Sequence, residues 1–111
     1  MTVHPQELPA DEPLSELEPV AHFDGALPTG VTVSRRGRIF VNFPRWGHDV
    51  EFTVGEVLEG RSVAYPDQAT NQIDSVDLAA GLVSVQSVVV DPADRLWILD
   101  TGRPLMQSAR F

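Results

Sequence analysis

The sequence predicts an all-β chain that forms part of a β-propeller, about one and a half blades of it. The first observation is composition, because 42% of the 111 residues are hydrophobic, enough for one small core. The second is an internal repeat: segment 30–43 (GVTVSRRGRIFVNF) matches segment 87–100 (SVVVDPADRLWILD) position by position, without a gap. Repeats of about 40–50 residues, each with several strands, are typical of propeller blades.

The start of the chain is expected to lie outside the folded part. Residues 1–29 carry six acidic side chains, no basic one and five of the nine prolines. Proline removes a backbone donor, and like charges repel each other. We therefore predict an acidic, proline-rich flexible tail over residues 1–19 and a folded region over residues 20–111.

Each copy of the repeat predicts a β-hairpin. A β-branched run, with Val31 and Val33 in the first copy, indicates a buried strand. Four turn residues follow, SRRG (34–37) or DPAD (91–94), in which Gly37 supplies a positive φ. A second apolar strand completes each hairpin. Both faces of the hairpin are apolar, as expected for a sheet that lies between neighbouring sheets.

The sequence between the two copies predicts less regular structure. FTVGEV (52–57) fits a capping box, with Thr53 as N-cap and Glu56 three residues later, so one or two helical turns are expected, ending near Gly60. Four oxygen-bearing residues further on do not have calcium-loop spacing and are expected in a solvated loop: Asp67, Asn71, Asp74 and Asp77.

Charge and composition exclude several classes of function. Sixteen acidic residues against eight basic ones give a formal net charge of −8, and the bases are scattered, which argues against nucleic-acid binding. No apolar run approaches the ~20 residues of a membrane helix, so no membrane partner is expected. The chain has no cysteine, and its three histidines are far apart, so no metal site is assigned.

The length predicts an incomplete propeller. Residues 1–29 precede the first copy and residues 30–86 make one full period, so only the segment 87–111 remains for a second period. Propellers close with about 4–8 blades, so the chain is expected to be a fragment of a longer protein or a truncated gene product. Alone it would expose apolar blade faces, and its expected partners are the remaining blades or further copies of itself.

Three strings carry a resemblance to a known family: LPTGVTVSRRGRIFVNFPRW (27–46), YPD (65–67) and LVSVQSVVVDPADRLWILDTGRP (82–104). They resemble the N-terminal region of the major royal jelly protein/yellow family, over about residues 20–104. The resemblance implies a six-bladed propeller of several hundred residues, usually secreted, with a ligand pocket at one end of its central channel. Some members look like binders of small amines and others are linked to dopachrome conversion, so the implied partner is a small-molecule ligand.

Two features depart from this family. The chain is far shorter, and its start (MTVHPQELPADEPL) has neither the basic nor the apolar segment of an export signal. The compartment is therefore left open, between the extracellular location usual in the family and a cytoplasmic one if Met1 is the true start.

Thr29 and Gln86 are the candidate ligand-binding residues, because each precedes the inner strand of one copy. In the neighbouring gluconolactonase/regucalcin type, a metal-ligating Glu stands where this chain has Thr29, before Gly30. Thr29 and Gln86 are both neutral and are poor ligands for a hard divalent ion. No cofactor is evident, and calcium would require residues outside this chain. Near a channel mouth, the alternatives for both residues are contact with a ligand and a hydrogen bond to the neighbouring blade.

Four further residues are assigned structural roles: Trp46, Trp97, Asp100 and Arg103. Trp46 is expected to pack within the blades, with a cation–π pair to Arg45 as the alternative. Asp100 and Arg103 are expected to pair and lock the DTGRP turn (100–104). Trp97 takes the place of Phe40 in the second copy.

No catalytic residue is assigned, because the chain holds no complete catalytic constellation. Three hypotheses for function remain. The first is a small-molecule-binding propeller, the second is a lactonase-like or dopachrome-converting enzyme of the propeller type, and the third is a truncated remnant without function.

Overall fold

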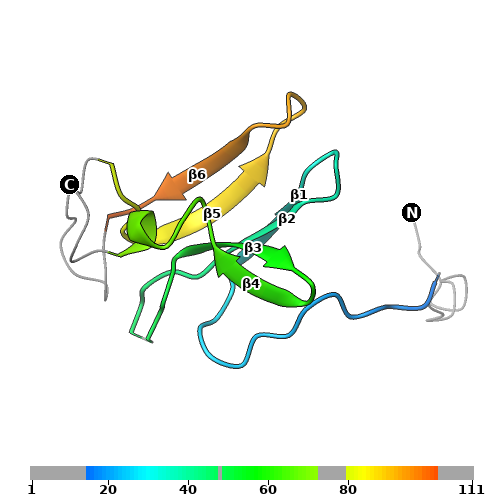
Figure 1. Cartoon of the computed structure of the whole chain (residues 1–111), viewed down its shortest axis with the longest axis horizontal. Helices are drawn as coiled ribbons and strands as arrows, with labels where there is room; N and C mark the ends of the chain where they lie inside the picture. The colour runs from blue at the N-terminus through cyan, green and yellow to red at the C-terminus, as the bar shows by residue number, and fades with distance from the viewer. Residues whose placement is uncertain (1–14, 48, 73–79, 103–111) are drawn as a thin grey trace, which may run out of the picture.

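The computed structural model describes residues 15–47, 49–72 and 80–102. Its elements, in chain order, are β1 (Gly30–Val33), β2 (Ile39–Asn42), β3 (Val54–Leu58), β4 (Arg61–Ala64), a 3-10 turn η2 (Ala69–Asn71), β5 (Val85–Val90) and β6 (Leu96–Asp100) (Figure 1). Strands β1 to β4 form one antiparallel sheet in sequence order, and β5 pairs with β6 in a separate hairpin. The all-β prediction is confirmed, and one sheet followed by one hairpin is the content expected of one and a half repeats.

The two copies of the repeat form the same hairpin in the same register. In β1–β2, Val31 pairs with Val41 and Val33 with Ile39. In β5–β6, Val88 pairs with Ile98 and Val90 with Leu96, which are the equivalent pairs of the second copy. The only departure within the described hairpins is a bulge between Val85 and Ser87, at the start of β5.

The turns that close the two hairpins are also equivalent. The backbone N–H of Ser34 donates to the Arg38 carbonyl at 2.8 Å, and that of Asp91 donates to the Arg95 carbonyl at 3.0 Å. The last turn residue has a positive φ in both copies, 81° at Gly37 and 63° at Asp94. Glycine reaches this region without strain, and aspartate tolerates it better than most residues.

The helix expected over residues 53–60 is a strand instead. Residues 54–58 form β3, and Arg61–Ala64 form β4, joined by a tight turn in which Glu59 and Gly60 both have positive φ (50° and 79°). Two positive φ values suit a two-residue hairpin loop whose twist matches the flanking strands. The capping-box groups have other partners, because the Thr53 hydroxyl donates to the Phe43 carbonyl and Glu56 pairs with Arg38 across the sheet.

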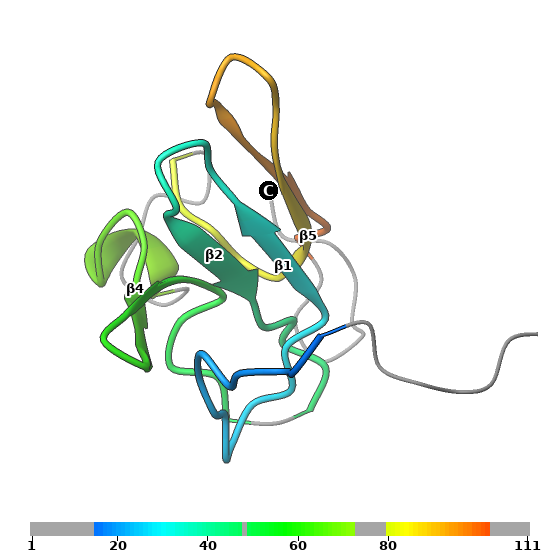
Figure 2. The ribbon, with the colours of Figure 1, turned by 90° about the vertical axis from the view of Figure 1, so that its right-hand side faces the viewer.

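The hairpin packs face to face on the sheet, with β5 beside β1 and β2 (Figure 2). A small core lies between them, built on Val54, Val85 and Val88. Burial of a valine side chain contributes roughly 1.5–3 kcal/mol, so this core alone is a modest source of stability. The residues packed around it are partly buried: Tyr65, Leu82, Leu96 and Ile98.

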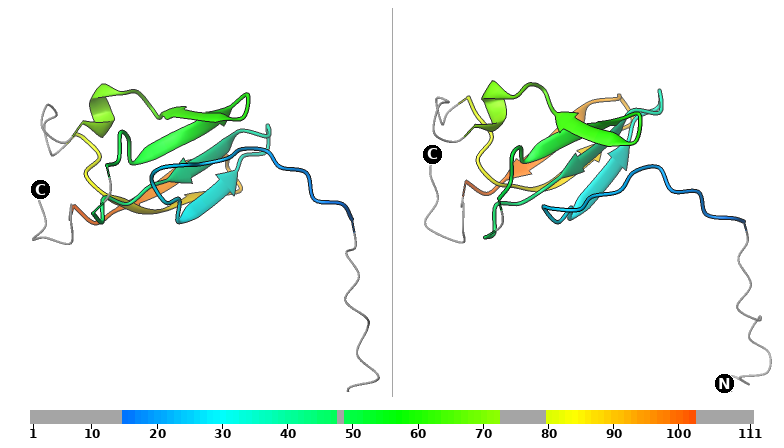
Figure 3. Two further views of the ribbon diagram at one scale, coloured as in Figure 1. Left: turned by 90° about the horizontal axis from the view of Figure 1, so that it is seen from below. Right: turned by 60° about the horizontal axis from the view of Figure 1, so that its bottom comes forward.

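The segment before β1 runs along the side of the sheet that faces away from the hairpin (Figure 3). Residues 15–19 have no regular secondary structure and are exposed, while residues 1–14 of the predicted tail lie outside the described residues. None of the described helical segments has the length and hydropathy that a membrane span requires.

Candidate functional site

Thr29 and Gln86, the two candidate ligand-binding residues, lie in contact at the junction of sheet and hairpin. The Thr29 hydroxyl donates a hydrogen bond of 3.3 Å to the Gln86 carbonyl. It accepts one of 2.9 Å from the side-chain amide of Asn42, which also donates to the Val85 carbonyl at 2.9 Å. The inter-repeat hydrogen bond, one of the two predicted alternatives, is therefore present, and ligand contact stays a prediction.

Gly30 allows Asn42 to reach this junction. A Cβ atom at position 30 would lie only 2.5 Å from the Asn42 Oδ1 atom, so a side chain there would displace the carboxamide. Asn42 is fully buried, and its Oδ1 has no hydrogen-bond partner among the described residues. Asn42 aligns with Leu99 of the second copy and was not predicted to have a role, although an amide at the end of an otherwise apolar strand was a signal in the sequence.

The exposed groups at this junction are neutral. Thr29 is exposed and Gln86 is partly exposed. A hydroxyl has one donor and two acceptor positions, so Thr29 keeps one acceptor position beyond its bonds to Gln86 and Asn42. The amide of Gln86 can both donate and accept. The site can therefore bind polar groups of a ligand without a full charge of its own.

A seam of buried polar side chains ties the sheet to the segment that leads into β5. Asn71 is fully buried, and its Oδ1 accepts from the N–H groups of Thr53 and Val54 at 2.9 and 3.0 Å. Its Nδ2 donates to the carbonyls of Tyr65 and Asp67, both at 2.9 Å. The prediction of a solvated loop is therefore wrong for Asn71, while Asp74 and Asp77 lie outside the described residues.

The same seam continues through three more buried residues. The Thr53 hydroxyl accepts from the Val85 N–H at 2.8 Å, which fixes the start of β5. The Arg45 N–H donates to the Ser84 hydroxyl at 2.9 Å, and its guanidinium contacts the Asn71 carbonyl. Arg45 is buried, whereas Trp46 beside it is exposed, so the packing of Trp46 within the blades stays a prediction.

Asp100 organises the end of β6. Its carboxylate accepts from the N–H groups of Val83, Ser84 and Gly102 at 2.7, 2.9 and 2.8 Å. A carboxylate that accepts several backbone N–H bonds holds the two segments together. Arg103 lies outside the described residues, so its pairing with Asp100 stays a prediction.

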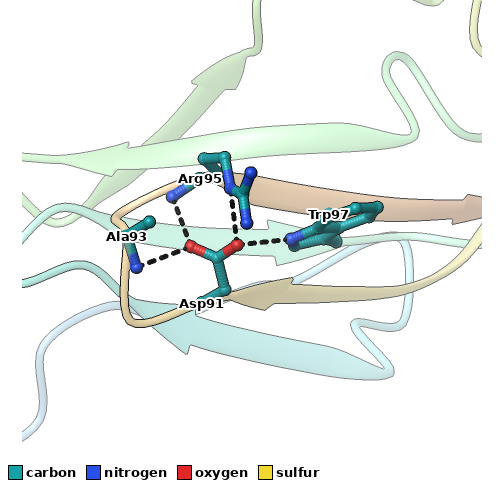
Figure 4. A network of polar contacts seen from close by, with 4 residues as sticks. All are labelled: Asp91, Ala93, Arg95 and Trp97. Carbon is teal, nitrogen blue, oxygen red and sulfur yellow. Dashed lines mark hydrogen bonds and ion pairs between the residues drawn. The ribbon is translucent and has the colours of Figure 1, made fainter.

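Trp97 belongs to a polar network at the turn of the second hairpin (Figure 4). The Asp91 carboxylate accepts from the Trp97 indole at 2.8 Å, from the Arg95 guanidinium at 2.7 Å and from the N–H groups of Ala93 and Arg95. These donors, the indole first, hold the pKa of Asp91 well below its usual value.

An arginine stacks on an aromatic ring in both copies. The Arg38 guanidinium lies 5.1 Å from the centre of the Phe40 ring, and that of Arg95 lies 5.5 Å from the Trp97 ring. Arg38 also pairs with Glu56 at 2.8 Å, which lowers the pKa of that carboxyl. This contact was not predicted, although the Arg-x-aromatic spacing at 38–40 and 95–97 was a signal for it in the sequence.

The comparisons with known proteins agree with the resemblance. No family profile and no solved structure matches the chain. Protein yellow of Drosophila melanogaster is 34% identical over 84 residues, covering 69% of this chain, and Protein yellow of Drosophila simulans gives the same values. The chain belongs to the major royal jelly protein/yellow family. It is a distant member. Protein yellow of Drosophila pseudoobscura pseudoobscura is also 34% identical over 84 residues.

The match covers only a small part of the length of each relative. The chain spans about 15% of the length of the curated relatives. The activity of a whole family member is therefore a separate question. Within the part of the chain that the structure describes, no group of three or more His, Asp or Glu side chains could hold a metal ion.

Proposed function

We propose that the chain forms the first one and a half blades of a royal jelly/yellow-type β-propeller that binds a small molecule in its central channel. Membership in the family supports the propeller, and so do two hairpins of identical register packed face to face. The observation that carries the ligand site is the contact of Thr29 with Gln86, because it brings two neutral polar residues together at the starts of successive inner strands.

In this proposal Thr29 and Gln86 are ligand contacts at the mouth of the channel. Their partners Asn42 and Val85 are positioning groups, since Asn42 holds the Thr29 hydroxyl and the Val85 carbonyl in one place. A ligand donor would use the remaining acceptor position of Thr29, and a ligand acceptor or donor would use the Gln86 amide. The ligand class that the family resemblance implies is a small amine.

Titration of the ¹⁵N-labelled chain with dopamine, a small amine, tests the proposal. We expect millimolar dopamine to shift the amide signals of Thr29, Gly30 and Gln86. Thr29→Val keeps the shape but removes the hydroxyl, and should weaken binding by roughly 2–10-fold, the effect of one hydrogen bond. Ser87→Ala, at an exposed neighbour in β5, is the control and should bind as the wild type does. Unchanged signals at these three residues, or equal binding by Thr29→Val, would contradict the proposed site.

A further inference from the structure

The repeat places equivalent residues on equivalent faces of the two hairpins. The face of the β5–β6 hairpin that packs on the sheet carries Val88, Val90, Leu96 and Ile98. Their equivalents in the first copy are all apolar too: Val31, Val33, Ile39 and Val41. Because the registers are the same, these earlier residues have the same spacing but lie on the side of the sheet away from the hairpin.

This outer sheet face, defined by Val31, Val33, Ile39 and Val57, is open along β1, whereas Val41, the fourth equivalent residue, is buried. Val31 is 65% exposed and Val33 57% exposed, although both lie in a strand. Ile39 pairs directly with Val57 on β3, so the face extends over three strands. The segment before β1 borders an apolar groove on it through Val20, Ala21, Phe23 and Pro28.

The far side of the hairpin is open in the same way. This hairpin face consists of Val89, Trp97 and Leu99, which are 54%, 57% and 59% exposed. Their equivalents in the first copy are Thr32, Phe40 and Asn42, which lie on the face of the sheet that the hairpin covers. Phe40 and Asn42 are buried there.

The two open faces therefore correspond to the two halves of one existing interface. The outer sheet face matches the surface that the hairpin presents to the sheet, and the hairpin face matches the surface that receives it. We infer that copies of this chain associate head to tail, with the outer sheet face of one copy on the hairpin face of the next. Such a contact is heterologous, so each copy keeps one free face and assembly continues until a ring closes or a filament forms.

The contact between copies differs from the one within the chain in its polar groups. Within the chain, the Val90 N–H donates to the Thr32 hydroxyl at 2.9 Å, and the Arg35 N–H donates to Asp94 at 2.9 Å. Position 89 is valine and position 92 is proline, which has no N–H, so neither hydrogen bond can recur at the next junction. Contact between copies must rely on apolar burial.

Charge sets the salt dependence of this association. The residues that define the two faces are uncharged, and the charged groups found against Trp97 are the paired Asp91 and Arg95, whereas the whole chain carries a net charge of −8. Repulsion between copies opposes association at low ionic strength, and salt screens it. We therefore expect association to increase between about 20 and 300 mM NaCl, opposite to the behaviour of a contact held by ion pairs.

Two charge variants in one mixing experiment test the inference. The 111-residue chain is examined by sedimentation and light scattering, without any ligand, as wild type, Val31→Glu and Leu99→Glu. Burial of a single unpaired charge in an apolar contact should weaken self-association by at least about 30–100-fold, so each variant alone should be a monomer. Mixed together, they should form a 1:1 dimer and nothing larger, because each variant retains the face that the other has lost.

Gln68→Glu is the matched control, since it adds the same charge at an exposed residue beside η2, outside both faces. It should associate as the wild type does. Circular dichroism checks that each variant is folded, and Val31→Gln with Leu99→Gln repeats the test with a milder change if either Glu variant is unfolded. Folded variants that form no dimer when mixed, dimers of one variant alone, or a wild type that stays monomeric at about 100 μM would each overturn the inference.

The test is independent of the proposed ligand site. If dopamine does not bind but the copies associate, only the proposed ligand site is contradicted. If dopamine binds but the copies do not associate, only the head-to-tail contact is contradicted.

Discussion

The hairpins 30–42 and 87–99 have one backbone conformation and two different sets of neighbours. Their strand registers and their turns are equivalent, including the positive φ at Gly37 and Asp94. The first hairpin continues into β3 and β4 and presents Thr32 and Asn42 to the next repeat. The second hairpin presents Val89 and Leu99 at the same positions, and both are exposed.

This difference separates the residues that determine the conformation of a hairpin from the residues that determine its neighbour. The apolar pattern and the turn residues are shared, and they determine the register. The polar contacts to the neighbour differ between the copies: in the first copy Thr32 and Asn42 hydrogen-bond to β5, and in the second copy Asp94 accepts from the Arg35 N–H. A repeat can therefore conserve its conformation while each junction acquires its own polar contacts.

The largest effect is expected from Asn71→Ala, which removes a residue that ties β3 to the segment after β4. Four backbone groups lose their hydrogen bonds to the Asn71 side chain: the N–H groups of Thr53 and Val54 and the carbonyls of Tyr65 and Asp67. Unsatisfied buried polar groups cost about 1–3 kcal/mol each, although water would reach some of these groups in the variant. We expect a loss of roughly 3–5 kcal/mol in the free energy of unfolding, measured with urea.

Gln68→Ala, at an exposed residue of the same turn, is the control for this measurement, because its side chain makes no cap hydrogen bond. It should change the unfolding free energy by no more than about 0.5 kcal/mol. Equal stabilities of the two variants would show that Asn71 does not hold β3 to the segment after β4.

A smaller effect is expected from Gly30→Ala compared with Ser87→Ala, at equivalent positions of the two copies. The new methyl group at position 30 would meet Asn42 Oδ1 at about 2.5 Å and push the carboxamide from its bonds to Thr29 and Val85. Overpacking of this kind costs roughly 1–3 kcal/mol, whereas Ser87 is exposed and its substitution should cost under about 0.5 kcal/mol. Equal losses at both positions would mean that the junction does not depend on Asn42.

The sequence predicted the parts of the fold that local chemistry determines. The gapless alignment of 30–43 with 87–100 predicted both hairpins, and the segments 34–37 and 91–94 predicted their turns. The prediction was wrong for 53–60 because Thr53 and Glu56 fit a capping box, but their side chains bind partners distant in sequence. Local spacing does not contain that information.

The site was predicted to a smaller extent for the same reason. Thr29 and Gln86 were singled out by their places before the two inner strands, and the structure brings them into contact. Asn71 was missed because its side chain joins two separate segments of the chain, 53–54 and 65–67. In the sequence, nothing distinguishes Asn71 from an exposed asparagine in an oxygen-rich loop. Only the tertiary packing buries it.

The smallest effect, and the one that most directly compares the two turns, is expected from Asp91→Asn. Asp91 replaces Ser34, whose hydroxyl accepts only from the Arg38 N–H among the contacts found at that turn, whereas the Asp91 carboxylate also binds Arg95 and Trp97. The pKa of Asp91 is lowered in the folded state, so its stabilising contribution is complete above the ordinary Asp value of about 3.9 and is lost as the pH falls through the lower folded value.

Asp91→Asn should therefore be less stable than the wild type at pH 7. The gap, which is the difference in the free energy of unfolding between the two proteins, should narrow between pH 4 and pH 2. Urea unfolding at pH 7, 4 and 2 measures this change. Glu56 and Asp67, whose pKa values are also lowered, keep their own acid dependence in both proteins, and it cancels in the difference. Ser34→Ala is the control, because serine does not titrate, and its gap to the wild type should stay constant over the same range. A gap for Asp91→Asn that is equally constant would show that the charge of Asp91 is not what distinguishes the second turn from the first.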